Sequence, residues 1–272
     1  MIDAGRFGGS RTVPHSIVGR VPGDSDIASI ARLLGQPSRA TMCMALLSGQ
    51  ALTATELARL AGVSKATASE HLQSLIAGGL LTVLIQGRHR YYRLAGPQVA
   101  EVLEGLARIA PRLPVRTLRQ STTAAALADA RTCYDHIAGR LGVTLYDRML
   151  ATDAITHHQG ELVLGVNIQL YDRLGLDLGH LQPRRHHHRR PQLRECQDWT
   201  ERRPHLAGSL AADLLTTMLT AGWITRTSRP RALTLTTPGR QFLTELGLLD
   251  QDEPTRSQAP QPDTPAHTQL AV

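Results

Sequence analysis

LTATELARLAGVSKATASEHLQSLIAGGLLTVLIQGRHRYYRL, residues 52–94, is the stretch that decides the fold. It opens on Thr53 and Glu56, which have the spacing of a capping box that satisfies free amide groups at a helix start. The inward face of a short helix would then consist of Leu57, Ala58, Leu60 and Ala61. Gly62 ends this helix, because glycine most easily takes left-handed backbone angles. The stretch therefore begins with one short helix and a tight turn.

A second helix follows the turn and has two unlike faces. Ser64 can cap it, and residues 65–77 can form it. Its apolar positions follow the i, i+4, i+7, i+8 spacing of a buried face, namely Ala68, Leu72, Leu75 and Ile76. The outward positions are Lys65, Ala66, Thr67, Ser69, Glu70 and Gln73, with His71 on the flank. These outward side chains are mostly small and hydrogen-bonding, which suits a helix lying close to base edges and phosphates.

Two short strands with a basic turn come next. Residues 80–86 and 89–94 alternate well enough for a hairpin whose tip carries Arg88, His89 and Arg90. Two helices across a turn, followed by such a hairpin, make a winged helix-turn-helix, which commonly holds its second helix in the DNA major groove. The alternative is an ordinary helical hairpin with a solvated basic turn.

The composition limits the classes of protein to consider. A length of 272 residues leaves room for two modest domains plus tails. A formal charge of +7 favours an anionic partner, either nucleic acid or an anionic membrane. No apolar run approaches the roughly 20 residues of a membrane span, and the N-terminus lacks a signal-peptide core. We therefore expect a cytoplasmic protein that has no membrane partner.

Cysteine and lysine are both scarce in this chain. Lys65 is the sole lysine, and it stands at the start of the second helix. Cys43, Cys133 and Cys196 do not make a secreted disulfide framework and are compatible with a reducing compartment. Cys43 falls among apolar residues of an expected helix over 38–47, so we predict a small core residue there rather than a metal ligand.

The segments around the central stretch complete a small domain over residues 24–110. Residues 1–23 lack helical or strand periodicity and are predicted to be a disordered tail. A short amphipathic helix is expected over 26–34. Residues 97–110 begin with a helix-favouring proline and carry many apolar side chains. We expect this helix to pair with a second copy of the chain, the alternative being packing within the same chain.

The segment from about Asp26 to Ala110 resembles the ArsR family of winged-helix regulators. The resemblance is carried by LLGQPSRATMCMALL, by TELARLAGVSKATASEHLQSLIAGGLL and by the wing GRHRYYRL. It implies a homodimer that binds double-stranded operator DNA and typically represses until an inducer binds. By position, it implies a groove-facing set of Ser64, Lys65, Thr67, Ser69 and His71, with Arg88 and Arg90 as wing contacts. Gln73 is a further candidate base contact.

Two metal-binding patterns of that family are missing. Metal-sensing members often carry Cys-x-Cys on the first helix of the helix-turn-helix, which reads ELARLAG here. Others place histidine and carboxylate ligands on the last helix, which reads VAEVLEGLARIA and has no histidine. A standard metal-sensor function is therefore unsupported, no cofactor is predicted, and the inducer is left open.

The second half is expected to hold a hinge over 111–123 and an accessory or sensing domain over 124–249. CYDHIAG and DWTERRPHLAG resemble motifs of a longer, two-domain subset of ArsR-like regulators. A helical region is expected over about 117–152. The helix–strand–turn–strand order near the end predicts a degenerate second winged helix. PRRHHHRRP is expected to be an exposed loop and residues 250–272 a disordered tail.

Two cysteines and two histidines of this half could form a site. Cys133 and His136 are three apart and are predicted to share one face of a helix, while Cys196 and His205 bracket DWTERRP. Such a 2+2 set matches tetrahedral zinc, although the spacing is irregular and the two pairs are distant in sequence. The alternative is a structural role. In that case Asp198 would pair with Arg202 or Arg203, and Trp199 would anchor the core.

Together these patterns predict a mainly α protein with small β-hairpins, an α+β chain, that acts as a homodimeric, sequence-specific DNA-binding repressor. Two alternatives are a metal- or thiol-responsive sensor and a non-specific DNA-binding protein. An enzyme with Cys133 as nucleophile and His136 as base lacks an oxyanion hole and a third orienting group. No enzymatic activity is therefore predicted.

Overall fold

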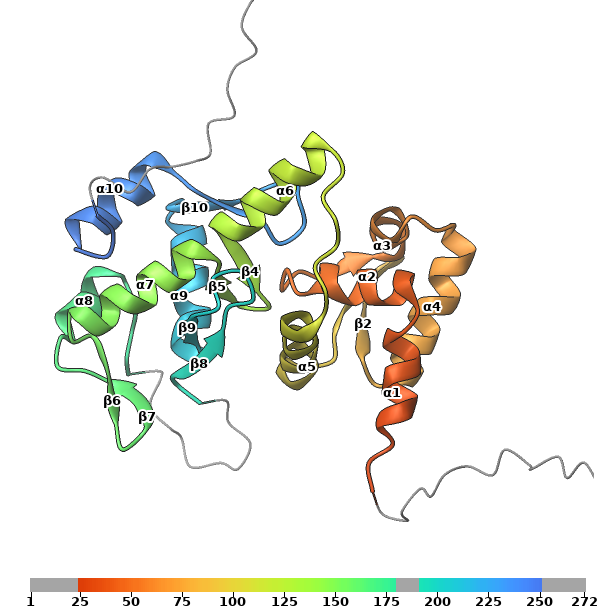
Figure 1. Cartoon of the computed structure of the whole chain (residues 1–272), viewed down its shortest axis with the longest axis horizontal. Coiled ribbons are helices and arrows are strands. Elements are labelled where there is room, and N and C mark those ends of the chain that lie inside the picture. The colour runs from red at the N-terminus through yellow and green to blue at the C-terminus, as the bar shows by residue number, and fades with distance from the viewer. Residues whose placement is uncertain (1–23, 180–190, 251–272) are drawn as a thin grey trace, which may run out of the picture.

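The computed structural model describes residues 24–179 and 191–250, and the following description refers to these residues (Figure 1). The tails predicted over 1–23 and 250–272 and the loop predicted at PRRHHHRRP lie outside them, apart from Asp250 and Pro191. Within the described part, no helix is both long enough and apolar enough to cross a membrane. The fold is α+β, with helices and small antiparallel hairpins.

The N-terminal half has the predicted winged helix-turn-helix. Its elements are α1 (Ile27–Leu34), α2 (Pro37–Leu46), β1 (Leu52–Thr53), α3 (Ala54–Ala61), α4 (Lys65–Ala77), β2 (Leu81–Gln86), β3 (His89–Leu94) and α5 (Pro97–Ile109). The strands form one antiparallel sheet in the order β1-β3-β2. Thr53 and Glu56 form both hydrogen bonds of the capping box at the start of α3, and Gly62 ends this helix at φ 66°.

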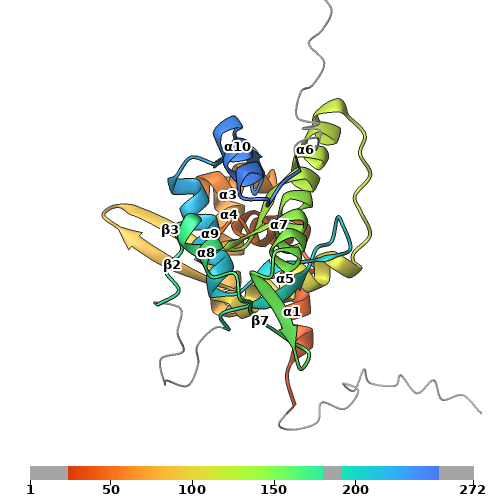
Figure 2. The ribbon, with the colours of Figure 1, turned by 90° about the vertical axis from the view of Figure 1, so that its left-hand side faces the viewer.

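The core of this half is built mainly from aliphatic side chains of α2, α3, α4 and the wing. Cys43 is fully buried in it, as predicted. Burial raises the pKa of the Cys43 thiol to about 12, against a weaker opposite influence of Arg39. Figure 2 shows the hairpin of β2 and β3 projecting away from the rest of the molecule. The wing is therefore placed to reach a partner.

The C-terminal half begins at α6 (Leu118–Asp129), which occupies part of the predicted hinge. Its remaining elements are β4 (Arg131–Cys133), β5 (His136–Ala138), α7 (Arg140–Ala151), β6 (Ile155–His158), β7 (Glu161–Leu164), α8 (Gln169–Arg173), β8 (Arg194–Gln197), β9 (Pro204–Ala207), α9 (Ser209–Thr220), β10 (Ile224–Arg226), β11 (Leu233–Leu235) and α10 (Thr237–Glu245). A second hydrophobic cluster fills this half. The domain boundaries at 111–123 and 124–249 stay predictions.

One helical prediction is wrong. The middle of the region 117–152 is a hairpin, β4–β5, so Cys133 and His136 face each other across two antiparallel strands instead of sharing a helix face. The turn between them contains Tyr134 at φ 61°, an angle that interrupts a helix. Strands of three residues are too short to display period-two alternation, which is why the sequence pattern missed them.

The structure also reveals an internal repeat in this half. A hairpin, a helix, a second hairpin and a second helix occur in the same order from β4 to α8 and again from β8 to α10. Each first hairpin ends in His, an apolar residue, Ala and Gly, at Gly139 and at Gly208. A Cβ atom on either glycine would lie within 2.8 Å of a backbone carbonyl oxygen, so both turns require glycine. The predicted helix–strand–strand order is thus present twice.

The two halves touch at the end of α2. The backbone N–H of Tyr134 donates to the Leu47 carbonyl at 2.9 Å, and the Thr132 hydroxyl reaches the same carbonyl at 3.3 Å. The Arg226 guanidinium donates to the Ser48 carbonyl at 2.9 Å. The β4–β5 hairpin therefore rests directly on the winged-helix half.

Candidate nucleic-acid interface and a buried cysteine–histidine cluster

The N-terminal turn of α4 is fixed by its own side chains. Ser64 caps the helix, since its Oγ accepts from the backbone N–H of Thr67 at 3.1 Å. The hydroxyls of Ser64 and Thr67 also lie 2.9 Å apart and share a hydrogen bond. Lys65 follows at the positive end of the helix dipole, where anions are favoured. This turn is a rigid, cationic helix start.

The predicted groove-facing residues differ in exposure. Ser64, Lys65, Ser69 and Gln73 are exposed, whereas Thr67 is half-buried. His71 is also half-buried, and its Nε2 is buried with no hydrogen-bond partner among the described residues. Ser64, Lys65, Ser69 and Gln73 are therefore accessible to a partner of α4, whereas His71 is the least accessible of the predicted groove-facing residues.

The wing presents both charge and apolar surface. Arg88 and Arg90 at its tip are exposed, as a contact to a phosphate backbone requires. Leu84 and Ile85 of β2 are 52% and 65% exposed. The sequence pattern did not predict this exposed apolar surface on the wing. The DNA-contact roles of the α4 and wing residues stay predictions.

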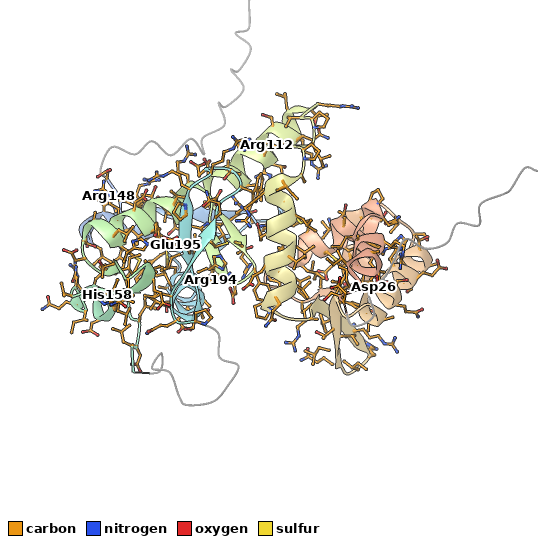
Figure 3. The ribbon with its side chains drawn as sticks, turned by 60° about the horizontal axis from the view of Figure 1, so that its bottom comes forward. Asp26, Arg112, Arg148, His158, Arg194 and Glu195 are labelled. Atoms are coloured by element: carbon orange, nitrogen blue, oxygen red, sulfur yellow. The ribbon has the colours of Figure 1, made fainter. Side chains whose placement is uncertain are left out.

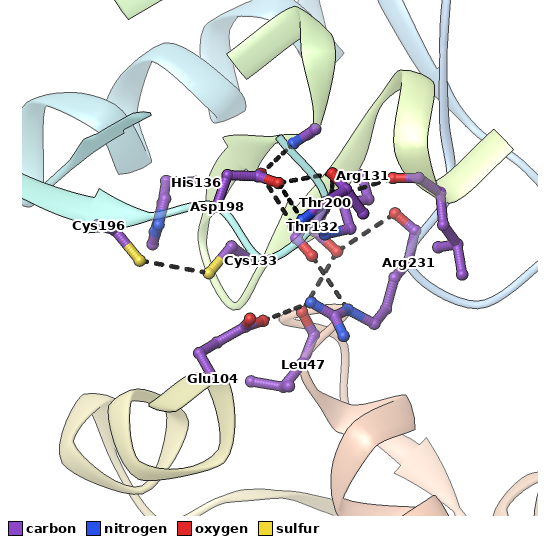
Figure 4. Close-up of polar contacts among 12 residues, drawn as sticks. Leu47, Glu104, Arg131, Thr132, Cys133, His136, Cys196, Asp198, Thr200 and Arg231 are labelled. Atoms are coloured by element: carbon purple, nitrogen blue, oxygen red, sulfur yellow. Dashed lines mark hydrogen bonds and ion pairs between the residues drawn. The ribbon is translucent and has the colours of Figure 1, made fainter. Parts of the chain in front are cut away.

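The four cysteine and histidine candidates come together between the two repeats. Cys133 faces His136 across the β4–β5 hairpin, and Cys196 faces His205 across the equivalent β8–β9 hairpin. One ligand atom from each of the four residues lies within 4.8 Å of all the others. The two sulfur atoms are 3.8 Å apart (Figure 4). The imidazole rings of His136 and His205 stack with their centroids 5.1 Å apart. Each copy of the repeat therefore contributes one cysteine–histidine pair.

This cluster is buried, and its ring nitrogens are poorly satisfied. Cys133, His136 and His205 are at most 3% exposed, and Cys196 is half-buried. Nε2 of His136 and both ring nitrogens of His205 have no hydrogen-bond partner within the described part of the chain. Buried polar atoms normally find such partners, so these nitrogens need an explanation.

A carboxylate lies near Nδ1 of each imidazole ring. Asp135 Oδ1 lies 3.2 Å from Nδ1 of His136, and Asp198 Oδ2 lies 3.8 Å from Nδ1 of His205. Burial alone would lower the pKa of His136, but Asp135 and Cys196 outweigh it and raise that pKa. Hydrogen bonding with Cys133 is the main cause that holds the pKa of the Cys196 thiol far below its usual range. The cluster thus favours a thiolate at Cys196.

Asp198 lies beside this cluster and forms a buried ion pair, but with a different arginine from the one predicted. It pairs with Arg131 at 2.9 Å, not with Arg202 or Arg203, and both side chains are fully buried. Arg203 instead reaches Asp147 at 2.7 Å. The predicted pairs were neighbours in sequence, whereas the tight turn directs their side chains apart.

Arg131 also contacts Trp199. The guanidinium lies 4.5 Å from the centre of the indole ring, a cation–π distance. Trp199 is half-buried, so it covers the ion pair and is not the fully buried core residue that the sequence predicted. Burial would raise the pKa of Asp198, but Arg131 and hydrogen bonds from Thr200 and from the backbone of Glu201 and Gly139 lower it well below its usual range. Asp198 is therefore ionised, and it fixes the β8–β9 turn.

A second buried ion pair, missed from the sequence, joins the halves. Glu104 of α5 pairs with Arg231 from the loop before β11, and both side chains are 7% exposed. Nε of Arg231 also donates to the Thr132 carbonyl at 3.1 Å, one residue before Cys133. Only the position of Glu104 could have indicated this pair from the sequence, because it lies four residues after Ala100 and therefore on the buried face of α5.

A cavity of about 320 Å³ lies between α5 and the two hairpins. Cys133, His136 and Cys196 are among its lining residues, and so is Glu104 on the opposite side. Arg194 of β8 reaches across to Glu101 of α5 at 3.1 Å; its position beside α5 is visible in Figure 3. The cysteine–histidine cluster is therefore reachable from a space that α5 also borders.

Known proteins resemble this chain over different lengths. Residues 34–83 match a family described as a helix-turn-helix domain. The uncharacterized HTH-type transcriptional regulator YdfF of Bacillus subtilis is 38% identical over 216 residues, which are 79% of this chain and 94% of that protein. The HTH-type transcriptional regulator CmtR of Mycobacterium tuberculosis is 31% identical over 32% of this chain and 72% of that protein.

A solved structure, the homodimeric winged helix-turn-helix DNA-binding domain of Mb0332 from Mycobacterium bovis, a possible ArsR-family regulator, is 29% identical. It covers 32% of this chain and 86% of its own, with a TM-score of 0.28. The 216 matched residues are more than either half contains, so the similarity to YdfF extends into both halves. With its helix-turn-helix, its wing and this relative, the chain belongs to the winged helix-turn-helix (HTH-type) transcriptional regulators.

Proposed function

We propose that this transcriptional regulator is a homodimeric, sequence-specific repressor that binds operator DNA through α4 and the wing. The observation that carries the proposal is the exposed polar face of α4, with Lys65 at its start, beside a projecting wing whose tip holds Arg88 and Arg90. Basic residues at both places neutralise phosphates, while Ser69 and Gln73 are free to approach base edges.

Dimerisation is supported by the outer face of α5. Val102, Leu106 and Ile109 follow helical spacing and are 51%, 42% and 81% exposed. The other face of the same helix is buried through Ala100 and Leu103. An exposed apolar stripe on an otherwise well-packed helix favours a protein partner. A second copy would also match the two-fold symmetry of operator half-sites.

A responsive function is the second candidate, because control of binding requires a signal. The relative CmtR is described as a cadmium metal sensor. The ligand patterns expected on α3 and α5 are missing here, whereas the cysteine–histidine cluster contacts the winged-helix half through the β4–β5 hairpin. We infer that a metal or thiol signal acts through the C-terminal half.

The test is a mobility-shift titration on the DNA upstream of the chain's own gene, at several salt concentrations and with random duplex as competitor. Arg88→Ala is expected to weaken binding to all sequences and to reduce the salt slope by about one. Gln73→Ala is expected to relax base preference, at a cost of about 1–3 kcal/mol. Arg173→Ala removes the same charge from an exposed site on α8 and serves as the matched control.

Two results would contradict this proposal. Equal affinity for upstream and random DNA would remove sequence specificity and leave a non-specific DNA-binding protein. A monomer by sedimentation, both free and on DNA, would remove the dimer. Replacement of Leu106 by Glu on the exposed stripe is expected to give a folded monomer with weakened operator binding.

A further inference from the structure

We propose that Cys133, His136, Cys196 and His205 form a tetrahedral site for one zinc-type divalent metal ion, held between the two repeats of the C-terminal half. Two thiolates and two imidazoles are a donor set that zinc prefers over harder cations. The four protein ligands fill every position of a tetrahedron. The site is therefore closed to a substrate and suited to a structural or regulatory ion.

The distances fit this geometry. Two thiolates bound to one tetrahedral zinc at about 2.3 Å each would lie about 3.8 Å apart, and the sulfur atoms of Cys133 and Cys196 are 3.8 Å apart. The other ligand atoms, which lie within 4.8 Å of one another, would have to approach by up to about 1.5 Å to reach the S–N and N–N separations of a tetrahedral zinc, a change that side-chain rotations supply. The hairpins need not separate or change register.

The unsatisfied nitrogens identify the coordinating atoms. Nε2 of His136 and Nε2 of His205 are buried and, within the described residues, have no hydrogen-bond partner. The opposite nitrogen of each ring faces a carboxylate, Asp135 at 3.2 Å and Asp198 at 3.8 Å. Metal-bound imidazoles commonly have such carboxylates behind them, since these fix the ring orientation and the tautomer. A metal ion would satisfy Nε2 of both rings, and Nδ1 of His205 would keep Asp198 at 3.8 Å as its nearest carboxylate.

The surroundings hold the ligands in place and leave a route to them. Arg131 anchors Asp198 in a fully buried pair, and the backbone N–H of Gly139 donates to the same carboxylate at 2.7 Å. On the open side, Cys196 is half-buried and lines the cavity of about 320 Å³ beside α5. A metal site needs both a supported ligand shell and an entry path, and the cluster has both.

The same hairpin can transmit occupancy to the winged-helix half. Cys133 and His136 flank the turn whose Tyr134 donates to the Leu47 carbonyl at the end of α2. The residue before Cys133 is held by Arg231, which pairs with Glu104 of α5 (Figure 4). A bound ion would tie β4–β5 to β8–β9 and so fix the hairpin against α2 and α5. This coupling, unlike the site, rests on the proposed DNA-binding function.

The site is tested on the full, tag-free, reduced chain by titration with Co²⁺ and by competition with Zn²⁺. The expected result is one ion per chain, with the visible absorption of tetrahedral cobalt and a thiolate-to-cobalt charge-transfer band. X-ray absorption of the zinc-loaded protein should show two sulfur neighbours at about 2.3 Å and two nitrogen neighbours at about 2.0 Å.

Variants separate this site from adventitious binding. Cys196→Ser and His205→Gln should each lower zinc affinity by about tenfold or more and weaken or remove the charge-transfer band. Cys43→Ala, a buried cysteine in the other half, should retain both. Replacement of His186, His187 and His188 by glutamine removes the run of adjacent imidazoles and should also leave the stoichiometry unchanged. Should a site variant fail to fold, the X-ray absorption of the unmodified chain still decides.

Three outcomes overturn the proposal: zinc bound by nitrogen and oxygen alone, loss of binding in the triple histidine variant, or a reversible Cys133–Cys196 disulfide in a chain that binds no metal. The coupling is measured separately, as a change in operator affinity of about fivefold or more between zinc-loaded and metal-free protein. Metal binding with unchanged operator affinity would refute only the coupling. Absence of any operator binding would refute the proposed function and leave the spectroscopic result standing.

Discussion

The ion pair between Glu104 and Arg231 gives the sharpest test of how the two halves are joined. Both side chains are 7% exposed, so Glu104→Ala would leave the Arg231 guanidinium buried without its carboxylate. Breaking one side of a buried pair typically costs about 3–5 kcal/mol. Arg231 keeps the Thr132 carbonyl as an acceptor, and the adjoining cavity of about 320 Å³ admits water, so we expect about 3 kcal/mol.

The assay is urea denaturation of the full chain at neutral pH, with the free energy of unfolding taken for each variant. The double substitution Glu104→Leu with Arg231→Met removes both charges and keeps most of the volume, so it should recover most of the loss. Arg194→Ala removes a more solvent-accessible ion pair to the same helix, with Arg194 30% and Glu101 48% exposed, and should cost less than about 1 kcal/mol. A loss below about 1 kcal/mol for Glu104→Ala, or a double variant as unstable as the single one, would refute a buried, energetically coupled pair.

Three further predictions concern other positions. Because the folded-state pKa of Asp198 is depressed, its pairing stabilises the fold above the unfolded value of about 3.9 and is lost as pH falls below it toward the lower folded value. Asp198→Asn should therefore destabilise the chain at neutral pH and flatten the acid limb of a stability–pH profile; an unchanged limb would contradict the buried Arg131 pair. Thr53→Ala removes the side-chain cap of α3 and should cost about 1 kcal/mol in thermal unfolding, with the exposed Thr41→Ala as a control that leaves the caps intact. Cys43 should resist alkylation in the native chain, because burial excludes the reagent and raises its pKa to about 12, and it should react on denaturation; rapid native labelling of Cys43 would show an open core.

The winged helix was predictable because its signals are local. The capping box of Thr53 and Glu56, the break at Gly62 and the cap at Ser64 act within one turn of the chain, and the structure contains all of them. The apolar spacing of α4 is regular enough to separate its buried and exposed faces. The outward position that differs is Thr67, which is half-buried because its hydroxyl joins the Ser64 cap, whereas the half-burial of His71 agrees with its predicted place on the flank.

The cysteine–histidine cluster was predictable only as a set of residues. The donor types at Cys133, His136, Cys196 and His205 indicated a site, but the sequence placed the first pair on a helix. Two short hairpins bring the pairs together, and their equivalence is visible only once the repeat is seen in three dimensions. The partners of Asp198 and Glu104 are far away in sequence, and no local pattern specifies such pairs.

The cysteine–histidine cluster lies outside α3 and α5, the two helices on which the ArsR ligand patterns are missing in this chain. Helix α5 has no histidine, yet Glu104 on its buried face is joined through Arg231 to the strand that ends in Cys133. The outer face of the same helix carries the exposed apolar stripe of Val102, Leu106 and Ile109. A signal received between the two repeats would therefore reach the proposed dimer interface across one helix. Ligands of the proposed sensing site can lie outside the winged helix because α5 has one face toward each of these two regions.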